Sequence, residues 1–306
     1  MPLTLHVDGP RWRAHLERIR DGHPGLVPVI KGNGYGFGID RLAERSAWLG
    51  VDTVAVGTYT EARTVAEVFP GSLLVLTPWR PFEAATGLDP RLVHTLGRLE
   101  DLRALTARAA EAGAEPPRVV LERLTSMRRH GFSARDLRLA AREAAAGGRV
   151  RVEGVALHLP MVSTTSTHRP KGPHLAEVHR LMTDIVASGV PARRVFVSHL
   201  TEAELGALGQ AYPDYELRPR IGTLLWLGDR AALRVTATVL DVHPVERGDV
   251  YGYRSRTAPA AGSILVVSGG TAHGIGLEAP TAGTTLRDRA ERVADGEGGH
   301  EEASES

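Results

Sequence analysis

Short β-branched runs alternate with longer helical patterns through the first 226 residues of this 306-residue chain, and this alternation restricts the possible folds more than any other feature. A strand, a helix and a second strand form a βαβ unit, whose strands lie parallel in one sheet. Eight such units in about 200 residues favour an α/β fold of the closed (β/α)8 TIM barrel type over an open doubly wound sheet. The strand candidates are residues 27–32, 51–58, 72–79, 91–97, 118–123, 152–159, 194–200 and 216–226.

The segments between the strands have helical periodicity, and several end in glycine, which is common just after a helix C-terminus. In barrels of this type, catalytic groups stand at the C-terminal ends of the strands. Polar residues at those ends are therefore the candidate site residues. The helix candidates are residues 10–22, 40–50, 60–69, 99–113, 134–148 and 174–189.

The pattern changes near residue 230, where strand candidates follow one another through turns without helices between them. We therefore expect a barrel over 9–228 and a smaller, incomplete all-β domain formed by 1–8 and 229–286. Residues 287–306 are polar, acid-rich and free of aromatic residues, so we expect a disordered tail.

Composition limits the partners of the chain. Lys and Arg number 37 against 36 Asp and Glu, so no global charge attracts nucleic acid or an acidic membrane. The sequence has no apolar run of the roughly 18 to 20 residues that crosses a bilayer, and its start lacks the order of a signal peptide. We expect a cytoplasmic protein that binds small molecules and copies of itself. Cysteine is absent, which excludes disulfides and cysteine nucleophiles.

Lys31 is the most informative single residue, because it stands where the first strand candidate meets the glycine-rich stretch GNGYGFG. This loop allows a ligand to approach the backbone closely, and Tyr35 can reach an anionic group held there. A dinucleotide site is the rival interpretation, since Asp52 follows about twenty residues later. However, the glycine spacing is not G-x-G-x-x-G, and a P-loop needs Ser or Thr after its lysine. Both nucleotide sites are therefore disfavoured.

The stretch IKGNGYGFG resembles the motif VKANAYGHG of alanine racemases, which are fold-type III enzymes that depend on pyridoxal 5'-phosphate (PLP). The resemblance covers roughly residues 5 to 285 and recurs in order at several strand ends. It implies a (β/α)8 barrel followed by a β domain, PLP as cofactor, an amino acid as substrate and a homodimer. By this resemblance Lys31 binds PLP covalently through its amine, and Tyr35 contacts the phosphate. Partial desolvation at a barrel mouth would make the amine of Lys31 a usable nucleophile and base.

Other strand ends carry further residues of the resemblance. The segment ERLTSMRRHGF resembles KVDTGMGRLGF, so Arg129 matches the arginine near the substrate carboxylate, which a guanidinium can bind with two hydrogen bonds. His158 in EGVALHLP matches the histidine after the GVYTHF strand, near the pyridine ring. In RIGTLLW, which resembles RxGIAxYG, Arg220 would face the pyridine nitrogen, with Gly222 and Thr223 beside the phosphate. A charged arginine there weakens the electron sink that decarboxylases and transaminases use, and therefore favours a racemase or simple PLP binding.

Ser198 and Thr201 are candidates for binding the phosphate, because VFVSHLTEAELG predicts a strand that runs into a helix start with free backbone N–H groups. Helix capping alone explains Thr201 equally well.

The sequence departs from the family pattern in the second catalytic residue. The family's second base is a tyrosine in a GYADG segment of the partner subunit, whereas this chain reads GTAHG, with Thr271 in its place. A threonine hydroxyl is a far weaker acid than a phenol with pKa near 10. The residues left as substitutes are His273, His199, Tyr251 and Tyr253.

Glu122 stands where many members of the family have a carbamylated lysine, and its carboxylate could supply the same negative charge to Arg129. The β-domain strands and the phosphate-binding tyrosine expected near the end of the chain are not recognised in the polar tail. A metal site is not expected, because His168, His174 and His179 lack the spacing of helical zinc ligands.

The sequence therefore predicts a PLP-dependent alanine racemase-like enzyme that interconverts L- and D-alanine by abstracting the α-proton. Three alternatives remain: a non-catalytic PLP-binding or regulatory protein, a one-base PLP lyase or aldolase for a hydroxy amino acid, and a barrel without PLP.

Overall fold

The structure is a computed structural model that describes residues 3–83, 89–161, 174–253, 255–273 and 275. The chain divides into two compact units, one of residues 8–232 and one of residues 1–7 with 233–306. The predicted tail (287–306), residues 276–286 of the predicted β domain and His168 lie outside the described residues.

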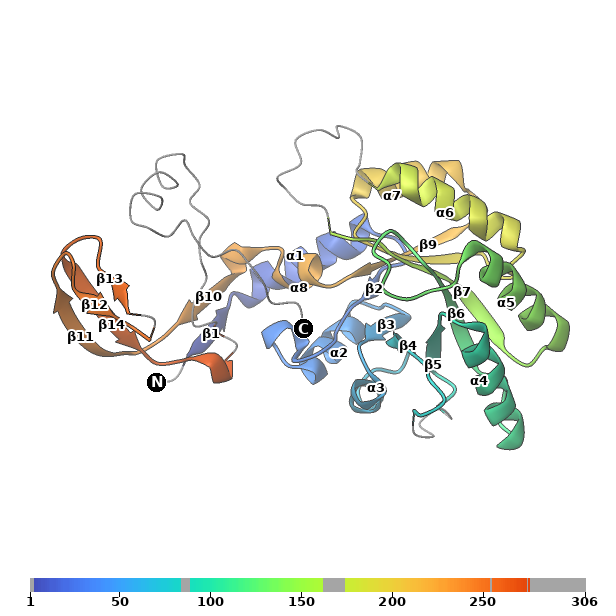
Figure 1. Ribbon diagram of the computed structural model, residues 1–306, viewed down its shortest axis with the longest axis horizontal. Helices are drawn as coiled ribbons and strands as arrows, with labels where there is room; N and C mark the ends of the chain where they lie inside the picture. The colour runs from blue at the N-terminus through green and yellow to red at the C-terminus, as the bar shows by residue number, and fades with distance from the viewer. Residues whose placement is uncertain (1–2, 84–88, 162–173, 254, 274, 276–306) are drawn as a thin grey trace. The chain divides into compact units, whose positions relative to one another are not determined.

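The first unit is built on eight parallel strands in the order β2-β9-β8-β7-β6-β5-β4-β3 (Figure 1). A parallel bridge between Val29 and Ala55 joins the two outer members of this order, β2 and β3. The sheet therefore closes on itself, and the predicted (β/α)8 barrel is confirmed. The strands are β2 (Val27–Pro28), β3 (Thr53–Val56), β4 (Ser72–Pro78), β5 (Leu92–Leu96), β6 (Arg118–Arg123), β7 (Arg151–His158), β8 (Arg194–Ser198) and β9 (Glu216–Ile221).

The helices of this unit lie along the outside of the sheet, as Figure 1 shows for α4, α5, α6 and α7. Local capping fixes several of their ends. Ser133 accepts the N–H of Asp136 at the start of α5, and Gly148 ends that helix with φ of 57°. The helices are α1 (Gly9–Gly22), α2 (Ile39–Trp48), α3 (Tyr59–Ala66), α4 (Leu99–Glu111), α5 (Ala134–Gly147), α6 (Leu175–Ser188), α7 (Glu202–Ala211) and α8 (Thr223–Leu227).

The last predicted strand is too long. β9 ends at Ile221, and the chain turns at Gly222 into the short helix α8. The turn buries Trp226 completely and lets its indole N–H donate to the carbonyl of Val29 at 2.8 Å. Burial of one large aromatic side chain therefore outweighs the strand-like pattern of residues 222–226.

Small and branched apolar side chains fill the barrel interior. The cluster consists of one buried residue from each of β2 to β8 and of Val29 just after β2: Val27, Val29, Ala55, Leu74, Val93, Val120, Ala156 and Phe196. β9 contributes no residue to this cluster, because the buried residues that share one face of it are Arg218 and Arg220, two positions apart. The guanidinium of Arg218 lies over the ring of Phe196, 5.9 Å from its centroid.

Charged side chains close the N-terminal end of the barrel. Glu153 is buried and accepts from Arg118 Nε at 2.7 Å, from Arg151 Nε at 2.9 Å and from Arg194 Nη1 at 3.1 Å. Removing the carboxylate would leave several guanidinium groups without their shared partner at a buried position.

We expect Glu153→Gln to lower the free energy of unfolding by about 3 kcal/mol, because one member of a buried ion cluster is lost. Urea denaturation at pH 7 measures this. Glu143→Gln is the control, because Glu143 forms a pair with Arg103 at the surface, for which a change below about 1 kcal/mol is expected. Equal effects of the two substitutions would contradict the structural role of the Glu153 cluster.

His94 on β5 is buried, and its Nδ1 shares a hydrogen bond of 2.8 Å with the hydroxyl of Tyr59. Burial lowers the pKa of His94 to about 4. In the unfolded chain this histidine has an ordinary pKa near 6.5. Between pH 6.5 and pH 4 the unfolded chain therefore binds a proton on His94 that the folded chain does not bind. The folded protein therefore loses stability as the pH falls from about 6.5 to about 4.

We expect His94→Asn to remove this contribution. Between pH 7 and pH 4.5 the wild type should lose about 2 to 3 kcal/mol more of its unfolding free energy than the variant, by urea titration at both pH values. A variant that loses stability with the same pH dependence as the wild type would contradict the neutral, buried state of His94.

The second unit is built of antiparallel pairs and contains no helix longer than a 3-10 turn among its described residues. The predicted β-rich domain after the barrel is confirmed. Thr271, which the sequence comparison predicts in place of a catalytic tyrosine, begins the 3-10 turn Thr271–His273. The pairs are β1 (Thr4–Val7) with β10 (Leu233–Thr236), β11 (Val239–Val245) with β14 (Gly262–Val267), and β12 (Val250–Tyr251) with β13 (Arg256–Thr257).

Within the described ranges, no helix has the length and apolar character needed to cross a membrane.

Candidate active site

The residues at the barrel mouth can be identified by counting two positions along each strand from the residue that it contributes to the core cluster. Side chains two positions apart in a strand share a face, so the residue two beyond each core residue forms the next layer toward the C-terminal end. Apart from Leu76 after Leu74, this count places polar groups and one glycine above the core. They are Lys31 after Val29, Gly57 after Ala55, Thr95 after Val93, Glu122 after Val120, His158 after Ala156 and Ser198 after Phe196.

Lys31 lines an open pocket of about 370 Å³ with Gly32, Asn33, Tyr35, Gly57 and Glu61. Lys31 is exposed in the single chain, and the partial desolvation of its amine stays a prediction. The strand ladder of β2 ends at Pro28, which leaves the lysine on the loop rather than within the sheet.

The loop after Lys31 folds back through left-handed backbone. Tyr35 has φ of 54° in a short 3-10 turn, and Asn33 Oδ1 accepts the N–H of Gly36 at 3.2 Å. This conformation carries the Tyr35 ring to β9, where a Cβ built on Gly222 would lie 1.9 Å from its hydroxyl oxygen. A side chain at position 222 would have to displace the ring of Tyr35. Partial burial raises the pKa of Tyr35, which keeps its hydroxyl protonated.

Arg220 is buried at the end of β9. Its Nη2 donates to the carbonyl of Leu157 at 2.9 Å, whereas its Nε is buried without a hydrogen-bond partner among the described residues. Burial lowers the pKa of this guanidinium, and the charge of Glu122 opposes that shift. Arg218 Nε on the same strand has the same status, and a water or a ligand could supply the acceptor that each N–H lacks.

Glu122 is buried, and its carboxylate lies beside the ring of His130 rather than beside the guanidinium of Arg129. Oε1 of Glu122 lies 3.5 Å from Nδ1 of His130. Burial raises the pKa of Glu122, while the charges of Arg220 and Arg129 oppose the rise. Burial, with help from the charge of Arg129, lowers the pKa of His130 to about 4. Arg129 thus acts on Glu122 through its field, and the sequence interpretation overlooked His130.

Two histidines lie side by side at the ends of β7 and β8. His158 Nδ1 is 2.9 Å from the hydroxyl of Ser198, and its ring meets that of His199 edge-on at 5.0 Å between centroids. His199 donates its Nδ1–H to the carbonyl of Leu159 at 2.6 Å. Burial and then the charge of Arg220 lower the pKa of His158 to about 3, and Lys31 contributes to the same shift. His158 is therefore neutral at pH 7.

Arg129 stands on the exposed loop after β6, which the structure fastens at two points. Thr125 donates its hydroxyl to the carbonyl of His158 at 2.6 Å. Glu177 of α6 accepts the backbone N–H of Ser126 at 2.6 Å and its hydroxyl at 2.7 Å. These contacts hold the base of the loop while the Arg129 side chain remains exposed.

Thr201 and Thr223 both stand at helix starts. Thr201 is the N-cap of α7 and forms a capping box with Glu204, so its hydroxyl is used within the helix cap. Thr223 is the first residue of α8, next to Gly222. The structure thus places Lys31 and Tyr35 in one pocket and Tyr35 against Gly222, and keeps the hydroxyl of Thr201 in a separate local role.

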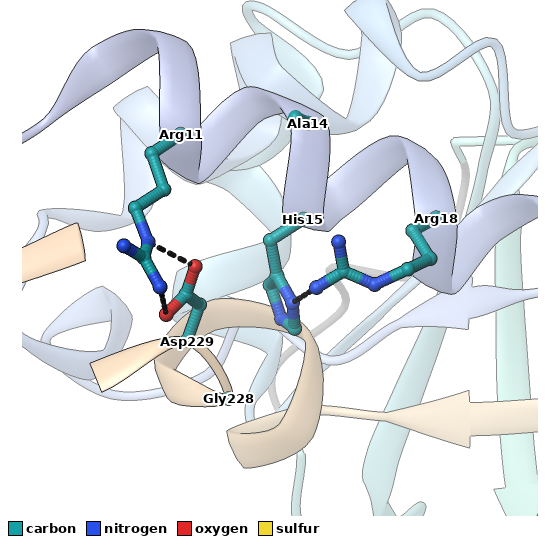
Figure 2. Close-up of a pocket in the computed structure, with 6 residues that line it drawn as sticks. All are labelled: Arg11, Ala14, His15, Arg18, Gly228 and Asp229. Carbon is teal, nitrogen blue, oxygen red and sulfur yellow. Dashed lines mark hydrogen bonds and ion pairs between the residues drawn. The ribbon is translucent and has the colours of Figure 1, made fainter. Parts of the chain in front are cut away.

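A second pocket, of about 430 Å³, lies between α1 and the segment after α8 (Figure 2). Arg11 binds Asp229 there through Nε at 2.7 Å and Nη2 at 3.2 Å. Arg18 donates to His15 Nδ1, and His15 Nε2 donates to the carbonyl of Leu224. Because these polar groups satisfy one another, this pocket is a weaker candidate than the barrel mouth. In the described part of the chain, no cluster of potential metal ligands occurs.

Comparisons with known proteins identify the family. The family model described as "Alanine racemase, N-terminal domain" matches residues 7–229. This chain belongs to the alanine racemase family. An alanine racemase of Methylobacterium sp. (strain 4-46) is 30% identical over 306 residues, which cover 97% of this chain and 78% of that protein. One of Lawsonia intracellularis is 29% identical over 138 residues, 44% of this chain and only 36% of that protein.

The likeness extends to solved structures of the alanine racemase family. An alanine racemase of Bartonella henselae with covalently bound pyridoxal phosphate has a TM-score of 0.64 at 17% identity, and covers 87% of this chain and 75% of that one. At this identity the likeness shows the shared fold. The alanine racemase family is PLP-dependent.

We expect Gly222→Ala to displace Tyr35, because the added methyl group would overlap its hydroxyl. The unfolding free energy should fall by about 1 to 3 kcal/mol. Adding Tyr35→Phe should recover part of the loss, because the overlapping oxygen is removed. Gly206→Ala in α7 is the control, since nothing lies within 4 Å of its added Cβ. Equal melting behaviour of the Gly222 and Gly206 variants would contradict the contact.

Proposed function

We propose that this protein is a PLP-dependent amino-acid racemase and that alanine is its substrate. The observation that carries the proposal is the buried Nε of Arg220, which has no partner within the described chain although it lies at the barrel mouth. An acceptor such as the pyridine nitrogen of PLP would satisfy it. The nearby Lys31, whose charge acts on His158 and His199, supports the same assignment.

The residues present fit the cofactor. Lys31 would hold PLP through its amine, and the hydroxyl of Tyr35, which rests on Gly222, would contact its phosphate with the start of α8. His158 and Ser198 would line the ring side of the site. Thr201 is the weakest member of the proposed set, because its hydroxyl already caps α7.

When bound, PLP supplies an electron-withdrawing ring that makes the α-proton of an amino acid more acidic. The amine of Lys31 would remove that proton from one face of the α-carbon, and an acid on the opposite face, which is unassigned here, would have to deliver a proton for the configuration to invert. Arg129, exposed on its fastened loop, would bind the substrate carboxylate. The fixed charge of Arg220 would keep the ring nitrogen unprotonated, which disfavours decarboxylation and transamination. A homodimer is part of the proposal, because the family's second base comes from a partner subunit.

A second candidate function is a PLP-binding protein without racemase activity. The observation that favours it is Thr271, which occupies an exposed 3-10 turn and offers only an aliphatic hydroxyl in place of a phenol. The two candidates share Lys31 and differ only in the second base.

Absorption spectroscopy tests the cofactor. The purified protein should take up PLP with a band near the visible edge, and Lys31→Ala should abolish that band. The matched control is Lys171→Ala, which removes the chain's other lysine, and it should retain the band. A wild type that takes up no PLP would contradict the proposed function.

Isotope exchange tests the reaction. With L- and D-alanine in deuterated solvent, a racemase should incorporate deuterium into the product of opposite chirality. Incorporation with retained chirality would indicate that only one base works. Absence of exchange over a panel of amino acids would contradict the racemase and favour the non-catalytic candidate.

A further inference from the structure

We propose that Glu61 is the residue that positions Lys31, because its carboxylate closes the seam between β2 and β3 at the barrel mouth. The inference deepens the proposed function, since it assumes that Lys31 is the reactive lysine. It concerns a glutamate on α3 to which neither the sequence pattern nor the family resemblance assigned a role.

The pairing between the β2 segment and β3, just before Lys31, has the fewest paired residues of any neighbouring strands in the barrel. β6 and β7 are paired over six positions, from Arg118 with Arg151 to Arg123 with Leu157. β2 and β3 are joined by the bridge of Val29 with Ala55, where the N–H of Ile30 donates to the carbonyl of Ala55 at 2.9 Å. Lys31 is the next residue, so little ladder holds its backbone in place.

Glu61 supplies the hydrogen bonds that the ladder lacks. Its Oε1 accepts the N–H of Gly32 at 3.0 Å, and its Oε2 accepts the N–H of Gly57 at 2.6 Å. Gly32 directly follows Lys31, and Gly57 directly follows β3. One carboxylate therefore joins the two chain segments beyond the point where backbone pairing stops. Hydrogen bonds to a charged acceptor are stronger than those between neutral groups.

Helix capping does not explain this orientation. Thr58 is the N-cap of α3 and accepts the N–H of Glu61 at 3.2 Å, so a capping box would have Glu61 return to the N–H of Thr58. Glu204 does this in α7, where its Oε2 accepts the N–H of Thr201 at 2.9 Å. Glu61 instead reaches past its own cap to Gly57 and across to Gly32.

Packing links this carboxylate to the side chain of Lys31. A Cβ built on Gly57 would lie 2.9 Å from Glu61 Oε2 and 3.2 Å from the Cβ of Lys31. The Gly57 backbone is therefore in contact with both the carboxylate and the base of the lysine side chain. Loss of the carboxylate would release Gly32, Gly57 and the Lys31 side chain together. The lysine amine would then sample a wider range of positions.

Backbone hydrogen exchange in the protein without cofactor tests the first half of the proposal. In Glu61→Gln the side chain keeps its shape but turns an amide NH2 toward one of the two backbone donors. The amides of Gly32 and Gly57 should then exchange about 10 to 100 times faster than in the wild type. Glu67→Gln, at an exposed residue at the end of the same helix, is the control and should leave both amides unchanged. Unchanged exchange in Glu61→Gln would overturn the proposal.

The rate at which PLP is fixed on Lys31 tests the second half. Borohydride reduction after mixing makes the lysine–cofactor bond permanent, and peptide mapping locates it. Glu61→Gln should react about tenfold more slowly than the wild type and the Glu67→Gln control, with an altered pH profile. Faster amide exchange combined with a normal rate and pH profile would show that Glu61 is merely structural, and would overturn the positioning role.

The two experiments distinguish failure of this inference from failure of the proposed function. If the wild type fixes no PLP on Lys31, the proposed function fails, while the exchange of Gly32 still decides whether Glu61 holds the lysine segment. If Glu61→Gln does not fold, hydrogen exchange in the wild type tests the proposal instead. Its Gly32 amide, on an exposed residue, should exchange as slowly as that of Ile30, and exchange at the rate of an unprotected loop would overturn the proposal.

Discussion

Closure of the sheet between β9, β2 and β3 is the constraint on which the site depends. β2 is only two residues long, yet it pairs with β9 at Val27 and Arg220 and reaches β3 through the bridge at Val29. Without that closure, Lys31 would stand at a sheet edge, away from the strand ends that carry His158 and Ser198. Pairing of this short strand on both sides therefore brings residues that are distant in sequence into one layer at the barrel mouth.

Electrostatics at the mouth follows from one buried carboxylate among several cations. Glu122 faces His130 and the fields of Arg220 and Arg129, and burial keeps His130 and His158 neutral at pH 7. The cations Lys31, Arg129 and Arg220 outnumber the carboxylates Glu122 and Glu61 near the mouth, and this balance suits an anionic phosphate and a carboxylate substrate. Neutral histidines in this position can contact a ring and a hydroxyl without adding to the positive charge.

The sequence predicted the barrel and most of its strands well, because continuous β-branched runs and regular βα spacing are local signals. Its errors came from tertiary contacts. The burial of Trp226 ended β9 early, and the short ladder of β2 ended before Lys31. Glu61 was missed because a glutamate at the third position of a helix is typical of a capping box. His130 was missed because its position in the family motif drew attention to Arg129.

The central claim is that Lys31 and Arg220 bind two ends of one PLP molecule at the barrel mouth. A crystal structure of the protein grown with PLP tests it most directly. The account predicts density continuous with the Nζ of Lys31 and a ring nitrogen within hydrogen-bonding distance of Arg220 Nε, the buried donor that has no partner in the described chain. Density for PLP in the pocket of Arg11 and Arg18, with Lys31 unmodified, would contradict the account.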